Sequence, residues 1–488
     1  MSNLSELLPT GGGQNAVDFV ASGTLSSGQA VVLKANGTVS AVTTSNVSDS
    51  VSSAYPYSNT RTTSGITGAV YDSANNKIVL FYSGPSVYGY AVVGTVSGTS
   101  ISFGTPVVFK SGNTNRPSAA YNVQDGKILV VWRSVSDSNE GKARVGTVSG
   151  TSISFGAEAT FLSGAWADYT SCVYMANCQK IAVAYKNRTT DISYVTVATI
   201  SGTSVSFSSG TSYASSTSNI NGQLIYDPDT EQIIIFYLQS SQGLARVGSS
   251  TGGNPSFGSS VVFSTNTAYE DEFGGIAATY DTVNQKVFVT WLRSTNRYGY
   301  IIYGTVSTNS ISFGTSTTYS STATKYPAMV FDPSAGKAVL CYSRTSDDTG
   351  FGLSITFTGS GFSKSSTTTF NPDQSRYIQL VYHPVEEKVI VDGDNYTPSP
   401  YNFGNAYVWT TAYTQSDYTS FIGITAEAIA NTATGAVNVY GGINEAQTGL
   451  TIGADYYVQV NGSLSTTASA VKVGQAISAT TINMMDLT

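Results

Sequence analysis

A twelve-residue segment, VGTVSGTSISFG, occurs twice in this chain, at residues 93–104 and again at residues 145–156. Looser copies begin at Val197 and Tyr303, and a degraded copy lies near Phe362. Repetition with a period of about 50 residues is typical of supersecondary units that bury their apolar faces only against one another. The chain is therefore expected to fold as an array, and its function is to be sought on the assembled array.

Each repeat also carries an apolar run that ends in an aromatic residue, followed by a polar turn and a second apolar run, as in AVYDSANNKIVLFY from Ala69. The residues that end the first run, which we call the pivot aromatics, are Tyr71, Tyr121, Tyr174, Tyr226, Tyr280, Phe331 and Tyr382. They are 50, 53, 52, 54, 51 and 51 residues apart. This spacing predicts seven copies.

One copy reads as four β-strands. The first ends at the pivot aromatic, and the second, such as KIVLFY, is apolar on both faces, as expected of a strand that is covered on both sides. The third and fourth are joined by SGTS, where glycine supplies the positive φ of a tight hairpin. Four strands in each of seven copies predict an all-β fold, a seven-bladed β-propeller. A β-solenoid, whose repeats are generally shorter, is the alternative.

The two ends of the repeat array predict how the ring closes. The seventh copy lacks a clear fourth strand before the repeat pattern ends at Phe421. The stretch SDSVSSAYPYS (residues 48–58) lies where such a strand would precede the first copy. We expect this stretch to complete the last blade of a propeller that spans residues 47–420, because closure removes exposed strand edges. The flanking segments, residues 14–46 and 421–488, alternate with period two around Asn-Gly turns and predict one small split β-domain.

Composition and charge argue against several classes of function. The net charge is −7 and no basic run is present, so nucleic acid is not expected as a partner. No stretch of about 18 apolar residues predicts membrane insertion. The first residues, MSNLSELLPTGGGQ, lack the features of a signal peptide, and three cysteines form no disulfide framework. Only 11 % of the residues are charged, whereas the chain holds 32 Tyr and 48 Gly, as in many extracellular β-proteins and viral fibres.

The C-terminal sequence resembles a known class of proteins. The stretch GLTIGADYYVQVNGSLSTTASAVKVGQAISATTI from Gly449 resembles a module near the ends of many tailed-bacteriophage fibre and virion-appendage proteins. VASGTLSSGQAVVLKANGTVSAV from Val20 and the opening SELLPTGGGQN are similar to the start of such proteins. The resemblance implies an oligomeric structural protein on the exposed surface of the virion, made in the host cytoplasm, that contacts other tail or capsid proteins and has no catalytic residues.

Residues 1–13 fit an anchoring arm that orders on a virion partner. The candidate anchoring residues are Leu4, Leu7, Leu8 and Pro9. A frayed terminus is the alternative interpretation. A phosphate-binding loop is not expected at the three glycines that follow, because no helix or Lys-Ser/Thr pair comes after them.

Comparison of the copies with one another separates two sets of loops. In a propeller the first-to-second and third-to-fourth strand turns lie at one end, and here they are uniform. The remaining loops lie at the other end, which we call the variable end, and they diverge in length and content. Uniform loops indicate a structural role in connecting the strands, whereas divergent loops indicate ligand binding, because binding sites concentrate on loops over rigid scaffolds.

The variable end supplies the candidate ligand-binding residues. Tyr and Trp present flat apolar area suited to sugar rings or protein partners, and Arg binds carboxylates or sulfates on acidic glycans. The candidates are Arg133, Trp166, Asp168, Tyr269, Arg293, Arg297, Tyr298 and Tyr396. Ordinary loop packing is the alternative for each of them.

Other chemistry is sparse. A carboxylate of the acidic run Glu270–Glu272 could pair with Asp168, Asp392 or Asp394 for glycoside hydrolysis. A Ca²⁺ site is the second hypothesis for these residues. Solvated charge is the preferred interpretation, because no sialidase Asp box is present. His383, the only histidine, stands one residue after a pivot aromatic and is expected to be a turn residue. Cys172 and Cys341 are expected to be small core residues.

The sequence thus predicts a non-enzymatic virion appendage, a tail fibre or capsid fibre, that forms homo-oligomers. Its propeller is expected to bind a host-surface glycan or envelope protein, without a cofactor or metal. Two alternatives stay open: a purely structural virion protein that binds no receptor, and a lectin or glycosidase outside a virus.

Overall fold

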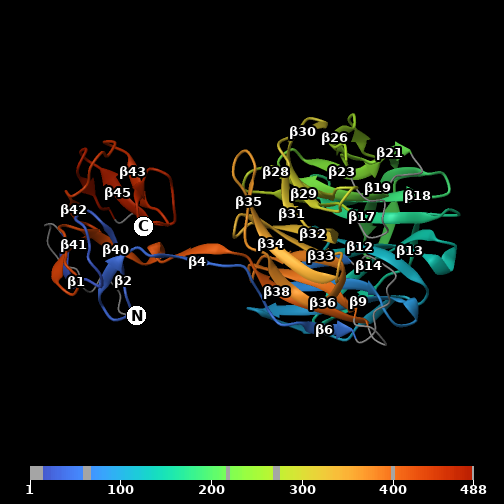
Figure 1. Ribbon diagram of the computed structural model, residues 1–488, viewed down its shortest axis with the longest axis horizontal. Helices are drawn as coiled ribbons and strands as arrows, with labels where there is room; N and C mark the ends of the chain where they lie inside the picture. Colours follow the sequence, from blue (N-terminus) through green and yellow to red (C-terminus); the bar gives the residue numbers. More distant parts are fainter. Residues whose placement is uncertain (1–14, 59–67, 216–219, 267–274, 397–401, 486–488) are drawn as a thin grey trace. The chain divides into compact units, whose positions relative to one another are not determined.

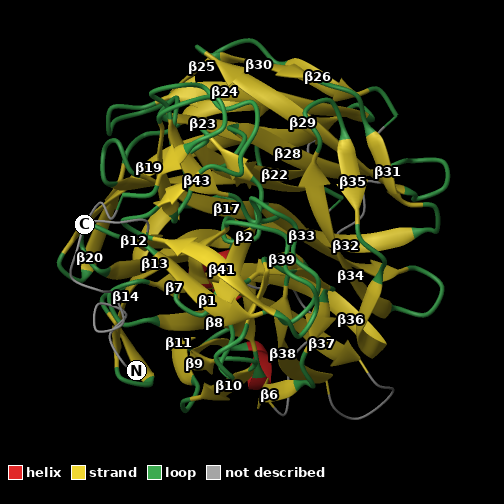
Figure 2. Ribbon diagram, turned by 90° about the vertical axis from the view of Figure 1, so that its left-hand side faces the viewer, coloured by secondary structure: helices red, strands yellow, loops and turns green. Residues whose placement is uncertain are grey.

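The computed structural model describes residues 15–58, 68–215, 220–266, 275–396 and 402–485. The chain divides into two compact units, one of residues 1–47 and 413–488 and the other of residues 48–412. Figures 1 and 2 show that almost all regular structure is strand, and the described helical segments are short 3-10 turns at Pro85–Val87, Val135–Asp137 and Tyr418–Ser420. The all-β fold class is therefore confirmed. No helix among the described residues is long and apolar enough to cross a membrane.

Residues 48–412 form successive antiparallel strand sets in chain order. The first strands are β7 (Gly68–Asp72), β12 (Thr114–Asn122), β17 (Ala167–Met175), β22 (Ile220–Asp227), β27 (Ala277–Asp281), β32 (Thr324–Asp332) and β36 (Thr368–His383). The second strands are β8 (Lys77–Ser83), β13 (Lys127–Ser134), β18 (Lys180–Asn187), β23 (Gln232–Gln239), β28 (Lys286–Leu292), β33 (Lys337–Arg344) and β37 (Lys388–Tyr396). The third strands are β9 (Gly89–Ser97), β14 (Glu140–Ser149), β19 (Ile192–Ser201), β24 (Gln242–Ser249), β29 (Gly299–Ser307), β34 (Thr349–Phe357) and β38 (Asn402–Thr410).

The outer strand of each set is broken into two short pieces that pair with the same third strand. The first pieces are β10 (Ser100–Phe103), β15 (Ser152–Phe155), β20 (Ser204–Phe207), β25 (Ser256–Phe257), β30 (Ser310–Phe313), β35 (Phe362–Lys364) and β5 (Ser50–Val51). The second pieces are β11 (Val107–Lys110), β16 (Ala159–Leu162), β21 (Thr211–Ser215), β26 (Val261–Ser264), β31 (Thr317–Ser320), the start of β36, and β6 (Tyr55–Ser58).

The strand sets succeed one another around a ring (Figure 2). Each first strand contacts the first strand of the next set, and β36 contacts β7. Seven clusters of buried apolar residues lie between neighbouring sets, including one between the last set and the first. In β8, Ile78 and Leu80 pack on one side while Val79 and Phe81 pack on the other. A β-propeller is therefore confirmed, and we infer seven blades from this closed succession.

The last blade takes its outer strand from the start of the propeller unit. Trp409 pairs with Val51, and Ala406 pairs with Tyr55, so β5 and β6 lie along β38. Asp49 strengthens this closure, because its carboxylate accepts hydrogen bonds from the Ala412 N–H at 2.6 Å and the Ser354 N–H at 3.0 Å. The ring is thus held shut by hydrogen bonds and packing rather than by a covalent link.

Hydrogen bonds made by the pivot tyrosines explain why an aromatic residue recurs at this position. The Tyr121 hydroxyl accepts a hydrogen bond from the Ala74 N–H at 3.2 Å, and the Tyr226 hydroxyl accepts one from the Asn177 N–H at 3.2 Å. Ala74 and Asn177 lie three residues after the pivot aromatic of the preceding blade. Backbone groups of Gln124 and Ser334 bond the Tyr174 and Tyr382 hydroxyls in the same way, whereas the Tyr280 hydroxyl donates to the Asp229 carboxylate. Each such bond ties one blade to the turn of its neighbour.

Phe331 has no hydroxyl and cannot make this bond to the turn at Val283. We expect Phe331→Tyr to raise the free energy of unfolding by about 0.5–1.5 kcal/mol, the net value of one hydrogen bond, as measured by urea denaturation. Tyr226→Phe is the matched control and is expected to lose a similar amount. A destabilised Phe331→Tyr variant would show that the added oxygen does not fit beside the turn.

The repeated twelve residues owe their constancy to a second contact between blades. A Cβ atom on Gly104 would lie 1.9 Å from the Thr151 carbonyl oxygen, and one on Gly156 would lie 1.9 Å from that of Thr203. Thr151 and Thr203 belong to the SGTS hairpins of the next blades, in which Gly150 has a φ of 61°. Each hairpin therefore needs its own glycine for the turn, and the SFG glycine of the preceding blade for space.

His383 is a turn residue, as predicted. In the first blade the Asp72 Oδ1 atom accepts hydrogen bonds from the Ala74 N–H at 3.0 Å and the Asn75 N–H at 3.2 Å. His383 occupies the same position in the last blade, where its Nδ1 atom accepts one from the Glu386 N–H at 3.2 Å. Burial lowers the pKa of His383 below its usual value.

Replacing His383 by asparagine is expected to flatten the pH dependence of stability. The unfolded chain protonates His383 below about pH 6.5, whereas the folded chain does so only at lower pH, so stability is lost as the pH falls below that point. Asn122 makes the same turn bonds in the second blade, with N–H···Oδ1 distances of 3.0 and 3.2 Å. Urea titrations between about pH 7 and about pH 5 should therefore give a smaller slope for His383→Asn than for the parent. Equal slopes would contradict the assignment.

The other unit is built from both ends of the chain. Its first sheet has the order β1 (Ala16–Val20), β41 (Thr434–Val439), β40 (Phe421–Thr425), β2 (Ala30–Leu33) and β3 (Val39–Ala41). Its second sheet has the order β42 (Ile443–Asn444), β46 (Ile482–Asn483), β45 (Lys472–Ala476), β43 (Asp455–Val458) and β44 (Leu464–Ser465). The predicted Asn-Gly turns join β2 to β3 and β43 to β44, with φ values of 81° at Gly37 and 79° at Gly462.

One boundary differs from the expected one. The sequence places residues up to 420 in the propeller, but the propeller unit ends at Ala412. The next strand, β39 (Tyr413–Ser416), pairs instead with β4 (Thr44–Val47). Asp417 then accepts hydrogen bonds from the Lys34 ammonium and the Thr43 N–H, both at 2.7 Å. These contacts between segments distant in the sequence give no local signal, which is why periodicity placed the boundary late.

Candidate functional site

Backbone irregularities shape the variable end of the propeller. In four blades the pairing of the first and second strands breaks at a residue with positive φ, five positions before the pivot aromatic. These residues are Arg116, Tyr169, Tyr326 and Tyr377, with φ values of 54°, 51°, 54° and 51°. Such β-bulges redirect side chains, and non-glycine residues held at positive φ concentrate at functional sites.

Between the second and third blades, three arginines surround one buried aspartate. Asp168, at the start of β17, is 1 % exposed. Its Oδ1 atom lies 3.2 Å from Arg116 Nε and 3.2 Å from Arg133 Nη1, and its Oδ2 atom lies 2.7 Å from Arg188 Nε. The cluster thus holds three formal positive charges against one negative charge. We call Arg116, Arg133, Asp168 and Arg188 the Asp168 cluster.

Two aromatic rings border the Asp168 cluster. The guanidinium carbon of Arg116 lies 4.3 Å from the ring centre of Tyr169, whose hydroxyl accepts a hydrogen bond from Arg188 Nη2 at 2.7 Å. Arg133 and Arg188 lie 5.6 and 5.7 Å from the ring centre of Trp166. These distances suit cation–π attraction, which is stronger where water is excluded. Trp166 is 41 % exposed, so its ring is open to a ligand.

Electrostatics show that the arginines repel one another across this cluster. Burial lowers the pKa of Arg133, and the charges of Arg116 and Arg188 lower it further, while Asp168 opposes both effects. Arginine side chains carry a positive charge in proteins at neutral pH. An incoming anion would therefore reduce the repulsion, which makes anion binding the chemistry that this arrangement supports.

A second ionic cluster lies between the sixth and seventh blades, and it is balanced in charge. Asp348 forms ion pairs with Lys325 and with Arg376, whose Nη2 atom lies 3.0 Å from Asp348 Oδ2. The Arg376 N–H also donates to Asp394 Oδ1 at 2.8 Å. Two cations thus face two carboxylates, in contrast to the Asp168 cluster. The Tyr326 and Tyr377 rings pack beside them, with centres 5.2 Å apart.

The other predicted arginines lie in the fifth blade. Arg293 lies over the Tyr300 ring at 5.1 Å and lines a cavity of about 330 Å³ with Trp291. Arg297 and Tyr298 belong to the loop after β28, in which the Arg297 N–H donates to the Arg293 carbonyl at 2.9 Å. The structure therefore brings Arg133, Trp166 and Asp168 together and places Arg293, Arg297 and Tyr298 in a separate loop.

Several predicted residues give no structural information. Tyr269 and the acidic run Glu270–Glu272 lie outside the described residues, as do Leu4, Leu7, Leu8 and Pro9. Tyr396 is the last residue of β37. Their assigned roles stay predictions.

The buried carboxylates of the last blade are engaged by protein groups. Asp392 accepts a hydrogen bond from the Tyr57 hydroxyl at 2.7 Å, and Asp394 accepts one from the backbone of Arg376. No group of three or more His, Cys, Asp or Glu residues within the described ranges is placed to hold a metal ion.

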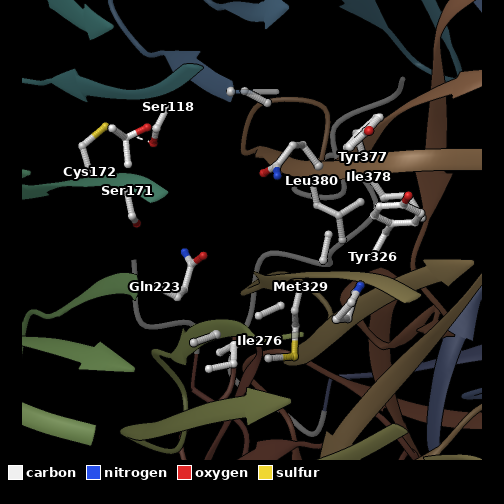
Figure 3. A pocket seen from close by; sticks show the side chains of 18 of the residues that line it. Ser118, Ser171, Cys172, Gln223, Ile276, Tyr326, Met329, Tyr377, Ile378 and Leu380 are labelled. Atoms are coloured by element: carbon white, nitrogen blue, oxygen red, sulfur yellow. Dashed lines mark hydrogen bonds between the residues drawn. The ribbon is translucent and has the colours of Figure 1, made fainter. Parts of the chain in front are cut away.

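A central cavity of about 230 Å³ runs between the first strands. Figure 3 shows Ser118, Ser171 and Gln223 on one side of it and Tyr326 and Tyr377 on the opposite side. Cys172 also lines this cavity, with its Sγ atom 3.4 Å from Ser118 Oγ. Cys172 is partly buried and also packs against the apolar cluster between the second and third blades, so the expectation of a core residue holds for Cys341 and in part for Cys172. The reason is that first strands face the cavity, whereas second strands lie inside the blades.

Three members of the site were not singled out from the sequence. Arg116 and Tyr169 occupy the same repeat position, five residues before a pivot aromatic, and Arg188 follows the second strand of its blade. A position-by-position comparison of the copies would have paired the first two. That they meet Asp168 depends on the bulges, which periodicity does not reveal.

Comparison with known proteins gives likeness of fold without a family. No family model matches the chain, and no curated protein matches it. The β-propeller domain of Cps50 (Swd1) from Myceliophthora thermophila is similar over 74 % of this chain and 99 % of its own, with 9 % identity and a TM-score of 0.49.

Two sugar-related proteins are also among the similar structures. The SapL1 lectin in complex with alpha methyl fucoside is 11 % identical over 64 % of this chain and 98 % of its own, with a TM-score of 0.39. The K499G mutant of NanB sialidase from Streptococcus pneumoniae is 8 % identical over 76 % of this chain and 70 % of its own, with a TM-score of 0.43. Likeness at this level concerns the propeller fold alone.

Proposed function

We propose that this protein is a structural appendage of a bacteriophage virion, a tail fibre or capsid fibre, whose propeller binds the host-cell surface through its variable end. The observation that carries the recognition role is the Asp168 cluster. It concentrates positive charge beside the exposed Trp166 ring on a chain of net charge −7. Cations next to a flat aromatic ring are suited to acidic glycans or to acidic patches of envelope proteins.

The attachment role is supported by the other unit. The segments from Val20 and from Gly449 that resemble phage appendage proteins both belong to this unit, where the first supplies β2 and β3 and the second supplies β43 to β46. Ala30 of the first packs in one buried cluster with Tyr456 and Val458 of the second. Such a unit is proposed to join the propeller to tail or capsid proteins and to further copies of this chain. Leu4, Leu7, Leu8 and Pro9 are proposed as its anchoring contacts. Many copies on one particle would multiply individually weak contacts with the host.

A non-catalytic role is proposed for the variable end. Both oxygens of Asp168 are held by arginines, and Asp392 is bonded to Tyr57. A glycosidase needs two carboxyl groups about 5–10 Å apart on either side of the substrate, one of them able to give up a proton. Asp168 and Asp392 are instead engaged by groups of the protein itself.

The proposal is tested in two parts with the full-length chain. Antibodies against the purified protein should label intact virions in electron micrographs, and fluorescent protein should bind host cells. Labelled virions without cell binding would favour a purely structural appendage. Cell binding without labelled virions would favour a lectin outside a virus. Release of reducing sugar from surface polysaccharide would overturn the non-catalytic assignment.

A further inference from the structure

We propose that the Asp168 cluster binds the carboxylate of an acidic sugar residue of the uronic acid type, with the sugar ring resting on Trp166. This inference deepens the proposed function, on which its biological meaning rests, by naming the ligand class. It differs from a general positive patch, because it assigns the carboxylate and the ring to different side chains.

The first step is the charge imbalance. Three guanidinium groups share the Asp168 carboxylate, and the side chains of Arg116 and Arg133 are only 9 % and 12 % exposed. Positive charges held this far from water repel one another strongly, because screening by solvent is weak there. A second carboxylate would balance part of this charge.

The second step is the supply of hydrogen-bond donors. Arg188 uses Nε for Asp168 and Nη2 for Tyr169, and its Nη1 atom has no acceptor within the described part of the chain. The Arg188 side chain is 38 % exposed, so this donor is reachable from solvent. The Nε atom of Arg133 is buried without a hydrogen-bond partner in the same described region. The cluster therefore has donors left over after Asp168 is satisfied.

The third step is the aromatic wall. The Trp166 ring lies near both arginines that retain donors, with its centre 5.6 Å from Arg133 and 5.7 Å from Arg188. A ligand that places an anion on Arg188 therefore meets the indole ring at the same time. The apolar face of a pyranose ring packs well on such a surface. A carboxylate directly attached to a sugar ring joins both features in one residue.

The fourth step is the choice of carboxylate over sulfate. The planar guanidinium group matches the planar carboxylate in shape. This cluster already holds the carboxylate of Asp168 through one nitrogen from each of three arginines. A sulfate carries its oxygens in a tetrahedral arrangement and usually projects on an ester linkage, away from the ring. The sugar ring then packs less well on Trp166, and the indole contributes less to the binding free energy.

The site is also rigid before any ligand arrives. The Arg188 N–H donates to the Trp166 carbonyl at 2.8 Å, and the Trp166 N–H donates to Thr189 Oγ1 at 3.2 Å. Asn187 Oδ1 in turn accepts from the Thr189 N–H at 2.9 Å. These bonds fix the backbone from which the Trp166 ring and the Arg188 side chain project, which reduces the entropy lost on binding.

The test uses the full-length protein and an oligogalacturonate, with the same oligomer after reduction of its carboxyl groups to alcohols. Binding is followed by calorimetry and by tryptophan fluorescence, since Trp166 is the exposed tryptophan of the described chain. We expect the oligogalacturonate to bind and the reduced oligomer not to bind. Arg188→Ala should weaken binding by about tenfold to hundredfold, as expected for a lost hydrogen bond to a charged group. Binding should weaken as salt is added.

Arg344→Ala is the matched control. The Arg344 side chain is also 38 % exposed, lies 4.9 Å from an aromatic ring centre, that of Phe351, and pairs with one aspartate, Asp347. It should leave oligogalacturonate binding unchanged. Thermal unfolding of both variants verifies that they are folded.

The other possible results of these binding experiments each decide the inference. Equal binding of the reduced oligomer, equal loss in Arg344→Ala, tighter binding of a sulfated oligomer, or no binding of oligogalacturonate would overturn the inference. Cell binding measured in parallel separates it from the proposed function. If the parent and Arg188→Ala bind host cells equally, recognition stands and the Asp168 cluster is not its site. If neither binds cells while oligogalacturonate binding needs Arg188, the ligand class stands and host recognition fails.

Discussion

Asp168→Ala is expected to lower the free energy of unfolding by about 3–5 kcal/mol, because removing one partner of a buried ion pair leaves uncompensated charge behind. The change strands Arg116, Arg133 and Arg188 around an empty space. Urea denaturation at neutral pH measures the effect. Acetate should restore part of the lost stability, since a small carboxylate that binds only the folded state stabilises it, whereas chloride at equal ionic strength should restore less.

Asp347→Ala is the control. Asp347 is 43 % exposed and pairs with Arg344, which is 38 % exposed, and an exposed pair of this kind contributes about 0–1 kcal/mol. A loss below about 1 kcal/mol for Asp168→Ala would mean that the arginines find other partners. The Asp168 cluster would then be a looser arrangement than its distances indicate.

Tyr57→Ala is expected to destabilise the protein by about 3–5 kcal/mol, the usual cost of removing a large buried aromatic side chain. Tyr57 lies in β6 and packs between the last blade and the first, with its ring centre 5.1 Å from that of Tyr82 and 5.5 Å from that of Phe103. Its hydroxyl also bonds the buried Asp392. Because the closing strands are held without a covalent link, hydrogen exchange should accelerate selectively in β5, β6 and β38.

Tyr213→Ala tests whether this effect belongs to the closure. Tyr213 occupies the equivalent outer strand of the third blade, is 3 % exposed, and packs 5.3 Å from Tyr237. Its loss should cost a similar free energy of unfolding but leave exchange in β5, β6 and β38 unchanged. The same exchange pattern in both variants would show that the ring opens as a whole rather than at β38.

The propeller could be predicted from the sequence because its causes are local and repeated. The second strands are apolar on both faces, and the structure buries Ile78 to Phe81 on two sides. The missing outer strand of the last copy pointed to residues 48–58, which is where β5 and β6 lie. The SGTS hairpin recurs because it contacts the neighbouring blade, so the repeated sequence itself indicates that the copies pack side by side.

The site could be predicted only in part. Arg133, Trp166 and Asp168 stand out because their loops diverge from the other copies. Arg116 is contributed by a different blade from Asp168, and the two meet because a bulge at positive φ turns the backbone between the paired positions Asn115 and Ser118. The extra residue of a bulge disrupts the ladder locally and redirects a side chain, and the spacing of the pivot aromatics does not reveal it. Side-chain encounters of this kind therefore need the structure.

The pairing of Ser50 with Thr410 has a mechanical consequence. The polypeptide enters and leaves the propeller at neighbouring positions, so two covalent connections share any load placed on a bound propeller. Traction that acts on both connections together moves Ser50 and Thr410 in the same direction and does not peel one from the other. A ring closed without a covalent bond can in this way resist traction on its two connections.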